Sequence, residues 1–414
     1  MTKEKRHFLI ITHAFPPMGG GGVQRIVKFA KYLQSYGWQA TVVCPTTNIY
    51  KWIDEDRMQE VKNIKIIRVP IDDIQSDMIS RIRLKLRFID AFYPWADKVV
   101  KQLLASGNHY DLVFTSGPPH SVHYVGRQLK RNRNIPWVAD FRDPFILAPE
   151  YKPATPVHSL VNYFFEKTIY KEANAIIANT AINAEELLKT FRLGGLQDKL
   201  FSIYNGYDDH DLADASLKIE NWDTNKINFL YLGGLRGDHI DGVFYKTLAK
   251  ALEINPQLRN EIKINIVGDG SRRGSMVNEL GLHKIISFYP PVAFDKVGAY
   301  LDKADAALTW QRDRAAYKGT IAGKLFDYIG KQLPIFSIGQ KNGEIAQILS
   351  DYKIGLTAPP HDIEEASKQF VLFCTGIIEK SFQYTKKDQQ SLAEKFNRIK
   401  QAEQLAKVFN KIMD

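Results

Sequence analysis

Four consecutive glycines, Gly19, Gly20, Gly21 and Gly22, separate the first apolar run of the chain from a helical pattern. Glycine has no Cβ, so the backbone of such a loop can approach a ligand closely. The free N–H groups and the positive dipole at the start of the following helix suit a phosphate. Ordering four glycines without a ligand is costly, which favours this interpretation over a flexible surface loop. We therefore predict that this turn binds phosphate.

Two familiar phosphate-binding motifs do not fit these residues. A Walker A motif ends in Gly-Lys followed by Ser or Thr, whereas this loop continues as Gly22-Val23-Gln24. A dinucleotide-binding fold places an acidic residue at the end of its second strand, and residues 43–46 read Val-Cys-Pro-Thr. The sequence therefore disfavours a P-loop NTPase and a dehydrogenase.

The elements that would carry this turn follow the pattern of parallel α/β architecture, in which short apolar runs alternate with amphipathic helices. In the first half we predict strands at residues 8–12, 40–44, 64–69, 112–115, 137–139, 175–178 and 201–204, and helices that include 23–36 and 120–130. Gly37 marks the stop of the first helix. After a polar segment we predict strands at residues 227–232, 262–267, 285–288, 306–309, 334–337 and 354–356, with helices that include 242–254 and 321–331.

The length of 414 residues exceeds what one hydrophobic core usually supports, which predicts two domains. We place an N-terminal α/β domain at residues 1–207, a linker at 208–225 and a C-terminal α/β domain at 226–387. A long helical pattern over residues 388–413 closes the chain. The predicted fold class is α/β with two Rossmann-like parallel sheets.

The composition and charge limit the kinds of molecule that the protein is expected to bind. The formal net charge is +10, which fits nucleic acid, an anionic membrane surface or a phosphorylated small molecule. No helix-turn-helix, zinc-finger or RNP signature accompanies it, so nucleic acid is disfavoured. The two cysteines, Cys44 and Cys374, are far apart and support neither a zinc site nor a disulfide framework.

The apolar segments are all short. The run at residues 8–11 is too brief for the core of a signal peptide, and no stretch approaches the length needed to span a membrane. We expect a cytoplasmic protein.

Several motifs appear in a characteristic order along nearly the whole chain: residues 10–17, 19–22, 111–120, 176–180, 203–208, 231–234, 266–270 and 324–335. With them the sequence resembles the GT-B glycosyltransferases, and specifically glycosyltransferase family 4. The resemblance implies two Rossmann-like domains facing across a cleft, with the acceptor mostly on the first and the donor mostly on the second. It also implies a final helix that crosses back to the first domain. Family members transfer a sugar from a nucleotide sugar with retention of configuration and generally need no bound metal and no further cofactor.

The donor site would lie in the second domain. Residues 324–328 match the donor-binding segment, in which Thr320 and the following amides would hold a diphosphate, Lys324 would neutralise it and Asp327 would bind the ribose. The alternative is a surface salt bridge or a helix cap. The family often carries a second acid eight residues before Asp327, and that position is Gly319.

Further donor contacts would come from two loops of the second domain. Gly233 and Gly234 mirror the N-terminal glycine loop, and Arg236 is a candidate for a diphosphate contact, with plain solvent exposure as the alternative. Gly268 and Asp269 would line the nucleotide pocket.

The acceptor side would lie in the first domain. His120 follows Pro118-Pro119 past a strand end and could bond the donor sugar or the attacking hydroxyl. An ungapped match places Ser116 at the position of the histidine that many relatives carry. Asp143 could position the acceptor, and an Arg142–Asp143 structural pair is the alternative.

Basic and apolar residues are mixed over residues 78–104. Arg81, Arg83, Lys85 and Arg87 alternate with aliphatic residues, which suits a helix on an anionic membrane; a helix packed on the sheet is the alternative.

Together these features predict a transferase that moves a sugar from a UDP- or GDP-sugar to a glycan or lipid-linked acceptor in bacterial surface polysaccharide or glycolipid assembly. It would act in the cytoplasm, at the inner face of the membrane. A nucleotide-sugar epimerase of the same architecture and a non-catalytic module that binds sugars or polyanions stay open as alternatives.

Overall fold

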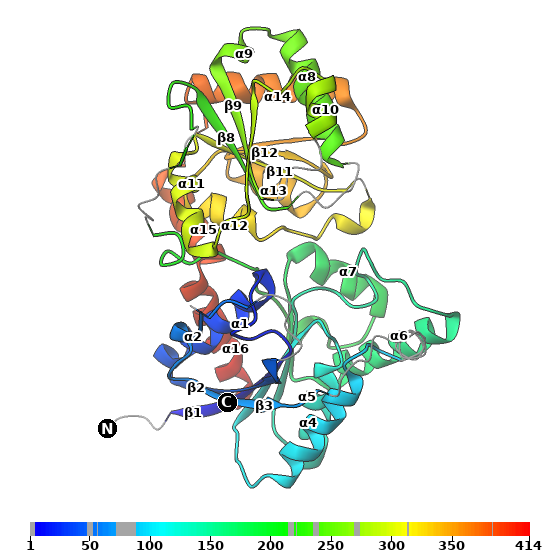
Figure 1. Ribbon diagram of the computed structural model, residues 1–414. Helices are drawn as coiled ribbons and strands as arrows, with labels where there is room; N and C mark the ends of the chain where they lie inside the picture. Colours follow the sequence, from blue (N-terminus) through cyan, green and yellow to red (C-terminus); the bar gives the residue numbers. More distant parts are fainter. Residues whose placement is uncertain are drawn as a thin grey trace. The chain divides into compact units, whose positions relative to one another are not determined.

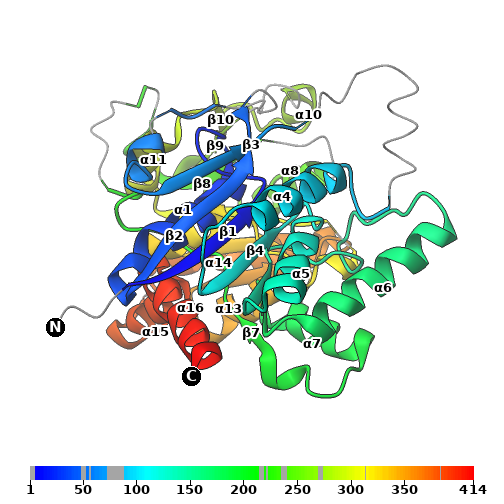
Figure 2. The ribbon, with the colours of Figure 1, turned by 90° about the horizontal axis from the view of Figure 1, so that it is seen from below.

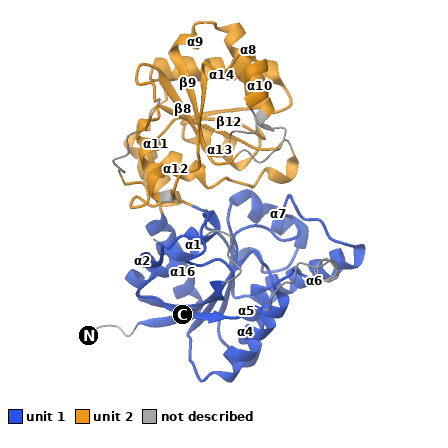
Figure 3. Cartoon of the chain, viewed as in Figure 1, with its two compact units in different colours: residues 1–205, 398–414 blue, residues 206–397 orange. Residues whose placement is uncertain are grey.

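The computed structural model describes residues 5–47, 53–55, 57–71, 88–213, 219–220, 222–234, 240–268, 274–312, 314–382 and 384–414. The chain forms two compact units, shown in separate colours in Figure 3. Unit 1 comprises Met1–Asn205 and Arg398–Asp414, and unit 2 comprises Gly206–Asn397.

Unit 1 contains a seven-stranded sheet in the order β3-β2-β1-β4-β5-β6-β7, and every strand pair in it is parallel. The inner strand β1 (Arg6–Thr12) is buried on both faces from Phe8 onward, as expected for a parallel sheet. Phe8 and Ile10 point into one core and Leu9 and Ile11 into the other. The strands are β1 (Arg6–Thr12), β2 (Trp38–Pro45), β3 (Lys65–Val69), β4 (Leu112–Gly117), β5 (Trp137–Phe141), β6 (Ala175–Ala178) and β7 (Leu200–Ser202).

Helices cover both faces of this sheet (Figure 1 and Figure 2). The first core takes side chains from α1 (Gly21–Tyr32) and α16 (Arg398–Met413). The second takes side chains from α4 (Tyr93–Ala105), α5 (Val122–Arg133), α6 (Pro156–Glu172) and α7 (Ala181–Phe191). The remaining short helices of unit 1 are α2 (Arg57–Glu60) and the 3₁₀ turns η1 (Leu33–Tyr36) and η3 (Gln197–Lys199).

Unit 2 repeats the architecture with a six-stranded sheet in the order β10-β9-β8-β11-β12-β13, again with parallel pairs throughout. Its strands are β8 (Ile227–Leu232), β9 (Ile262–Val267), β10 (Ile286–Tyr289), β11 (Ala306–Trp310), β12 (Ile335–Ile338) and β13 (Gly355–Ala358). Its helices are α8 (Ile240–Ile254), α9 (Leu258–Glu261), α10 (Gly274–Glu279), η5 (Phe294–Lys296), α11 (Val297–Lys303), η6 (Ala315–Tyr317), α12 (Lys324–Gly330), α13 (Glu344–Asp351), α14 (Ile363–Ile378) and α15 (Lys386–Phe396). The predicted fold class is confirmed: two α/β units, each with a wholly parallel sheet.

The end of the chain differs from the single helix predicted over residues 388–413. The structure has two helices, α15 and α16, that meet at Asn397, whose backbone is extended. The Asn397 side chain donates to Asp209, and Phe396 O accepts a hydrogen bond from Tyr207 N, so α15 is fixed within unit 2. Only α16 returns to unit 1, which confirms the crossing helix with a later start.

Two other segments refine the sequence predictions. The first helix stops at Tyr32 and continues as a 3₁₀ turn to Tyr36, and Gly37 then takes a left-handed conformation with φ 84°. Residues 206–213 belong to unit 2, where Asp208 and Leu212 are buried.

The basic and apolar stretch at residues 78–104 is only partly described. Residues 72–87, with the four cations, lie outside the described residues. The rest forms α4, which packs Trp95, Val99 and Leu103 into the second core of unit 1. In the described part of the chain, no helix combines the length and the hydrophobicity that crossing a membrane requires. Cys44 and Cys374 are buried thiols in different units.

Candidate active site

The glycine loop of unit 1 lies between β1 and α1. Gly20 has φ 97°, a left-handed conformation that L side chains rarely adopt. No described atom lies within 4 Å of a Cβ added at Gly20 or Gly21, so the space above these two residues is open. The backbone at the start of α1 is therefore accessible, and phosphate binding at this turn stays a prediction.

Arg142 joins the loops that follow three neighbouring strands. Its guanidinium donates to Gly22 O in the loop after β1 and to Pro118 O, 3.1 Å away, in the loop after β4, while Arg142 itself follows β5. Asp143 beside it is exposed, and its charge interacts with that of Arg142. The hydrogen bonds of Arg142 thus go to carbonyl oxygens, and the residue acts as a brace across the carboxyl edge of the sheet.

Beneath this edge lies a buried ion pair. Arg25 of α1 donates to both carboxylate oxygens of Asp140, at 3.1 and 2.7 Å, and also to Ile203 O and Tyr204 O. Ser116 Oγ donates to Asp140 at 2.7 Å and is buried. Breaking such a buried pair typically costs about 3–5 kcal/mol. The hydroxyl of Ser116 is therefore engaged in the core of unit 1 and does not face solvent.

His120 is a buried, neutral imidazole in the loop after β4. Its ring lies 4.6 Å from that of Phe145 and 5.6 Å from that of Phe141. Burial, followed by the charges of His123 and Arg142, holds the pKa of His120 well below its usual value. Its Nδ1 has no hydrogen-bond partner among the described residues. A neutral imidazole with an unengaged nitrogen can exchange hydrogen bonds with a hydroxyl group.

His123 supports the same loop from α5. Its Nδ1 lies 2.8 Å from Thr115 Oγ1, which accepts a hydrogen bond from Trp137 Nε1. Burial lowers the pKa of His123 to about 3. A Cβ at Gly117 would lie 3.0 Å from His120 Nδ1 and 3.1 Å from His123 Nε2. Glycine at this position lets both rings approach the backbone.

Two further residues at this edge had no assigned role in the sequence analysis. His13 follows β1, its ring lies 4.1 Å from that of Phe92, and burial and the charge of Arg142 lower its pKa to about 4. Asp90 accepts hydrogen bonds from Ser121 N and Phe92 N, and burial raises its pKa. His13 stood inside the glycine-loop motif, whereas nothing near Asp90 in the sequence signals its partner at Ser121.

In unit 2 the glycine-bearing loops after β8 and β9 touch. Gly233 has φ 112° and Gly268 has φ 142°, and a Cβ at Gly268 would lie 2.5 Å from Gly233 O. Gly233 N donates to Val267 O and Gly268 N to Tyr289 O, which fixes both turns to neighbouring strands. Gly234 has no described atom within 4 Å of an added Cβ. The predicted contacts Arg236 and Asp269 lie outside the described residues.

Lys324 lies beside these loops. Its Nζ is 3.3 Å from the centroid of the Tyr231 ring at the end of β8, and the other neighbour of Tyr231 is Trp310, stacked at 3.8 Å. A Cβ at Gly233 would be 3.6 Å from the same ammonium group. A cation over an aromatic face is held in place, and here it lies next to the turn of Gly233 and Gly234, which the sequence analysis assigned to donor contacts.

The segment before Lys324 differs from the prediction. The helix was expected from Ile321, and α12 begins at Lys324 because residues 320–323 form turns instead. Thr320 N donates to Tyr317 O, and Thr320 O accepts from the Gln311 side chain. The amide of Thr320 is therefore occupied within unit 2. Asp327 is half-buried on α12, one turn after Lys324.

In the part of the chain that the structure describes, no three His, Cys, Asp or Glu residues gather as metal ligands would. Each unit thus presents, at the carboxyl ends of its central strands, glycine turns beside cationic or imidazole groups. In open α/β sheets this edge is where ligands bind.

Solved structures share this two-unit fold. Sucrose-phosphate synthase from Thermosynechococcus elongatus is 16% identical, with a TM-score of 0.66 and 99% of each chain covered. HepE from Anabaena, in complex with UDP and glucose, is 17% identical, with a TM-score of 0.64 and 97% of this chain and 99% of that one covered. The lipopolysaccharide outer core galactosyltransferase WaaB is 15% identical, with a TM-score of 0.58 and coverages of 98% and 99%.

The fold is that of the GT-B glycosyltransferases. The sequence model of glycosyltransferase family 4 matches residues 19–211 of this chain. Comparison with curated proteins gave no significant match.

Proposed function

We propose that the protein transfers a sugar from a nucleoside-diphosphate sugar to a hydroxyl acceptor, with retention of anomeric configuration and without a bound metal. The observation that carries the proposal is the position of Lys324, whose ammonium lies over Tyr231 and next to the turn at Gly233. A fixed cation beside an open backbone turn suits a diphosphate leaving group, whose negative charge grows as the sugar departs.

The donor is a UDP-sugar or a GDP-sugar in this proposal. The Anabaena protein HepE, which shares the fold, has been solved with UDP and glucose and with UDP-glucose, which favours uridine. Lys324 would pair with the diphosphate and Asp327 would bind the ribose hydroxyls. Gly234 offers open space next to the phosphate. Arg236, Gly268 and Asp269 stay candidates for further contacts on the donor.

The reaction is front-side displacement at the anomeric carbon. The bond from the anomeric carbon to the phosphate oxygen breaks, the bond to the acceptor oxygen forms on the same face, and the acceptor proton passes to the departing phosphate. The protein contributes position and charge rather than a nucleophile. Nδ1 of His120 would bond a sugar or acceptor hydroxyl, the loop at Gly19–Gly22 would bind phosphate, and Asp143 would orient the acceptor.

We place this reaction in the assembly of surface polysaccharide or glycolipid, in the cytoplasm at the inner face of the membrane. The fold is shared with WaaB, a galactosyltransferase of the lipopolysaccharide outer core. The net charge of +10 suits phosphorylated substrates and an anionic surface. The acceptor in this proposal is a glycan or a lipid-linked sugar.

A thermal-shift panel with UDP, GDP, ADP and CMP tests the donor site. Ligand at 100 times its dissociation constant should stabilise the wild type by about 2.7 kcal/mol. We expect one nucleotide to do so, and Lys324→Ala to lose most of the effect. Lys331→Ala is the matched control, because Lys331 ends the same helix and pairs with Asp302. No stabilisation by any nucleotide at millimolar concentration would remove the donor-site assignment.

The alternatives give other results. An epimerase would convert UDP-sugar to its epimer without an acceptor, which chromatography of the nucleotide sugars detects. A binding module would bind the nucleotide sugar, but it would produce no free nucleotide from it on incubation with acceptors. Gly319, at a position where relatives often carry an acid, is the residue that favours the binding module.

A further inference from the structure

Helix α6 of unit 1 exposes an apolar stripe. Val157, Leu160 and Phe164 are 59%, 57% and 54% exposed. Their spacing of three and four residues puts them on one face of the helix. The other face is buried and carries Asn162, Glu166 and Ile169 among others. This helix therefore has a packed side and an uncovered apolar side.

Phe88 lies beside the buried face of the same helix. Its ring stacks on that of His158, with centroids 4.7 Å apart, and Phe88 is 44% exposed. Of the nine large apolar side chains exposed in the described part of the chain, three belong to the stripe of α6. Such a concentration marks an interaction site more often than single exposed apolar residues do.

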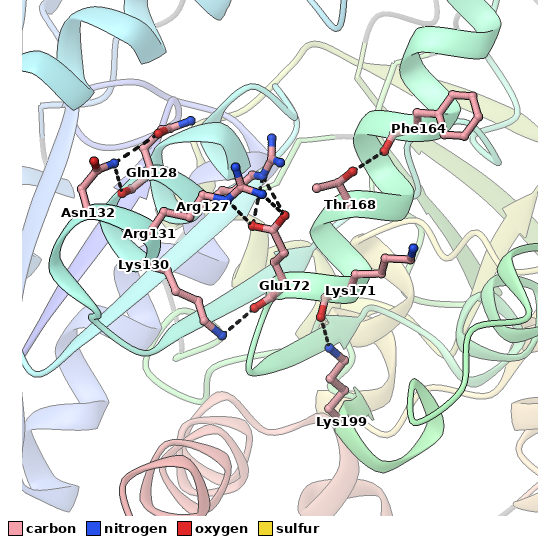
Figure 4. Close-up of polar contacts among 10 residues, drawn as sticks. All are labelled: Arg127, Gln128, Lys130, Arg131, Asn132, Phe164, Thr168, Lys171, Glu172 and Lys199. Atoms are coloured by element: carbon pink, nitrogen blue, oxygen red, sulfur yellow. Dashed lines mark hydrogen bonds and ion pairs between the residues drawn. The ribbon is translucent and has the colours of Figure 1, made fainter.

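The same face becomes basic toward its C-terminal end. Lys167 and Lys171 follow Phe164 at three and seven residues, and Lys171 is exposed. The Lys167 ammonium lies 5.5 Å from the centroid of the Tyr163 ring. Figure 4 shows Phe164, Thr168 and Lys171 in succession along α6, beside a group of cations from α5. The apolar stripe thus runs directly into positive charge.

The cations around the end of α6 outnumber the acids. Arg127 and Arg131 both bind the Glu172 carboxylate, at 3.1 and 2.6 Å. Lys130 donates to Glu172 O and Lys199 to Lys171 O and Ala173 O, as Figure 4 shows in part. Burial, followed by the charge of Lys130, lowers the pKa of Lys199. Arg127, Lys130, Arg131 and Lys199 thus bring four cations to the C-terminal end of α6, where Arg127 and Arg131 share the Glu172 carboxylate.

We propose that α6 docks on an anionic lipid bilayer, with Val157, Leu160 and Phe164 inserted at the boundary of headgroups and acyl chains and Lys167 and Lys171 on acidic headgroups. A bilayer offers apolar and anionic partners side by side, which matches this face. A nucleic acid would leave the apolar side chains uncovered, and a second copy would bring like charges together. The inference deepens the membrane contact of the proposed function and rests on that part of it.

Co-sedimentation of the full chain with vesicles tests the docking. We expect binding to phosphatidylcholine vesicles that contain phosphatidylglycerol, and much weaker binding to phosphatidylcholine alone. The double variant Leu160→Glu/Phe164→Glu should lower the partition coefficient at least about tenfold. Lys167→Gln/Lys171→Gln should lower it by about fivefold for each lysine, and high salt should do the same.

Leu372→Glu is the matched control, because Leu372 is 56% exposed on α14 of unit 2 and should change nothing. Equal binding by all variants, or no binding to the anionic vesicles, would overturn the proposal. So would a dimer, seen by sedimentation equilibrium without lipid, that Leu160→Glu dissolves. Nucleotide stabilisation in the thermal-shift panel should be the same for the α6 variants and the wild type. That measurement shows that the variants are folded, and it reports on the donor site separately from the docking.

Discussion

His123 shows how a single buried residue shapes the loop that carries His120. Its Nδ1 meets Thr115 Oγ1, which is in turn held by the Trp137 indole, so the ring is fixed from below. Its pKa of about 3 keeps it neutral at physiological pH. The sequence drew attention to His120, one helical turn earlier, because that residue follows two prolines at a strand end. His123 gave no such signal, since its partner Thr115 lies on the preceding strand.

We predict that His123→Asn makes the protein less sensitive to acid. Between pH 6.5 and about 3 the His123 side chain is protonated in the unfolded state but neutral in the folded state. The free energy of unfolding therefore falls as the pH drops through this window. Removing the group should reduce that slope by up to about 1.4 kcal/mol per pH unit. Urea unfolding between pH 7 and pH 4.5 measures the slope. An unchanged slope would mean that His123 is not the buried neutral base described above.

At the residue scale, the sequence predicted which candidate residues lie near the carboxyl edges of the sheets but not the contacts that hold them. The glycine loop, Lys324 and Gly233 stand at the carboxyl ends of strands, as expected. The brace from Arg142 to Gly22 spans 120 residues of sequence, and the pair of Arg25 and Asp140 spans 115. Such partners follow from strand order in the sheet, which local patterns do not encode. Ser116 is an example of such a contact, because its hydroxyl donates a hydrogen bond to Asp140 on the neighbouring strand.

Among the elements, α16 fills part of the first core of unit 1 although it comes last in the sequence. Phe409 is fully buried, and its ring centroid lies 5.3 Å from that of Phe8, 5.1 Å from Trp38 and 5.8 Å from Phe114. The helix thus fills the first core between β1, β2 and β4. Residues from both ends of the sequence share this cluster.

We expect Phe409→Ala to destabilise unit 1 by about 3–5 kcal/mol, because it leaves a cavity among three aromatic rings. Ile399→Ala is the control on the same helix: Ile399 is 41% exposed, and its loss should change stability by less than about 0.5 kcal/mol. Urea denaturation followed by circular dichroism would resolve the effect as an earlier transition. Similar midpoints for both variants would contradict the described packing.

The sequence predicted which segments form helices and which form strands better than it predicted the residues at which they end. Short continuous apolar runs, which are typical of strands in parallel sheets, placed each strand to within a few residues. The break at Asn397 escaped notice because Leu392 and Phe396 on one side and Ala402, Leu405 and Phe409 on the other keep nearly the spacing of one helix. The two halves of that pattern are buried in different units, which periodicity alone cannot reveal.

For the molecule as a whole, the proposed division of labour gives unit 2 the donor. We predict that UDP added to the full chain slows amide exchange at residues 231–234 and 324–330 of unit 2. Helix α7 of unit 1, which carries none of the proposed contacts, should exchange at the same rate with and without nucleotide. Hydrogen-exchange mass spectrometry makes the measurement. Protection confined to unit 1 would reverse the assignment of donor and acceptor sides.

The return of α16 to unit 1 has a consequence for biosynthesis. A ribosome makes β1, β2 and α1 first, yet residues 398–414, which complete their core, are made only after all of unit 2. Domains commonly fold in order as they emerge, N-terminal first. Here the nascent first unit must wait, with Phe8 and Trp38 lacking their partner Phe409, while the second unit is translated. The unit that begins first is therefore finished last, and during that interval its uncovered aromatic face is open to chaperones.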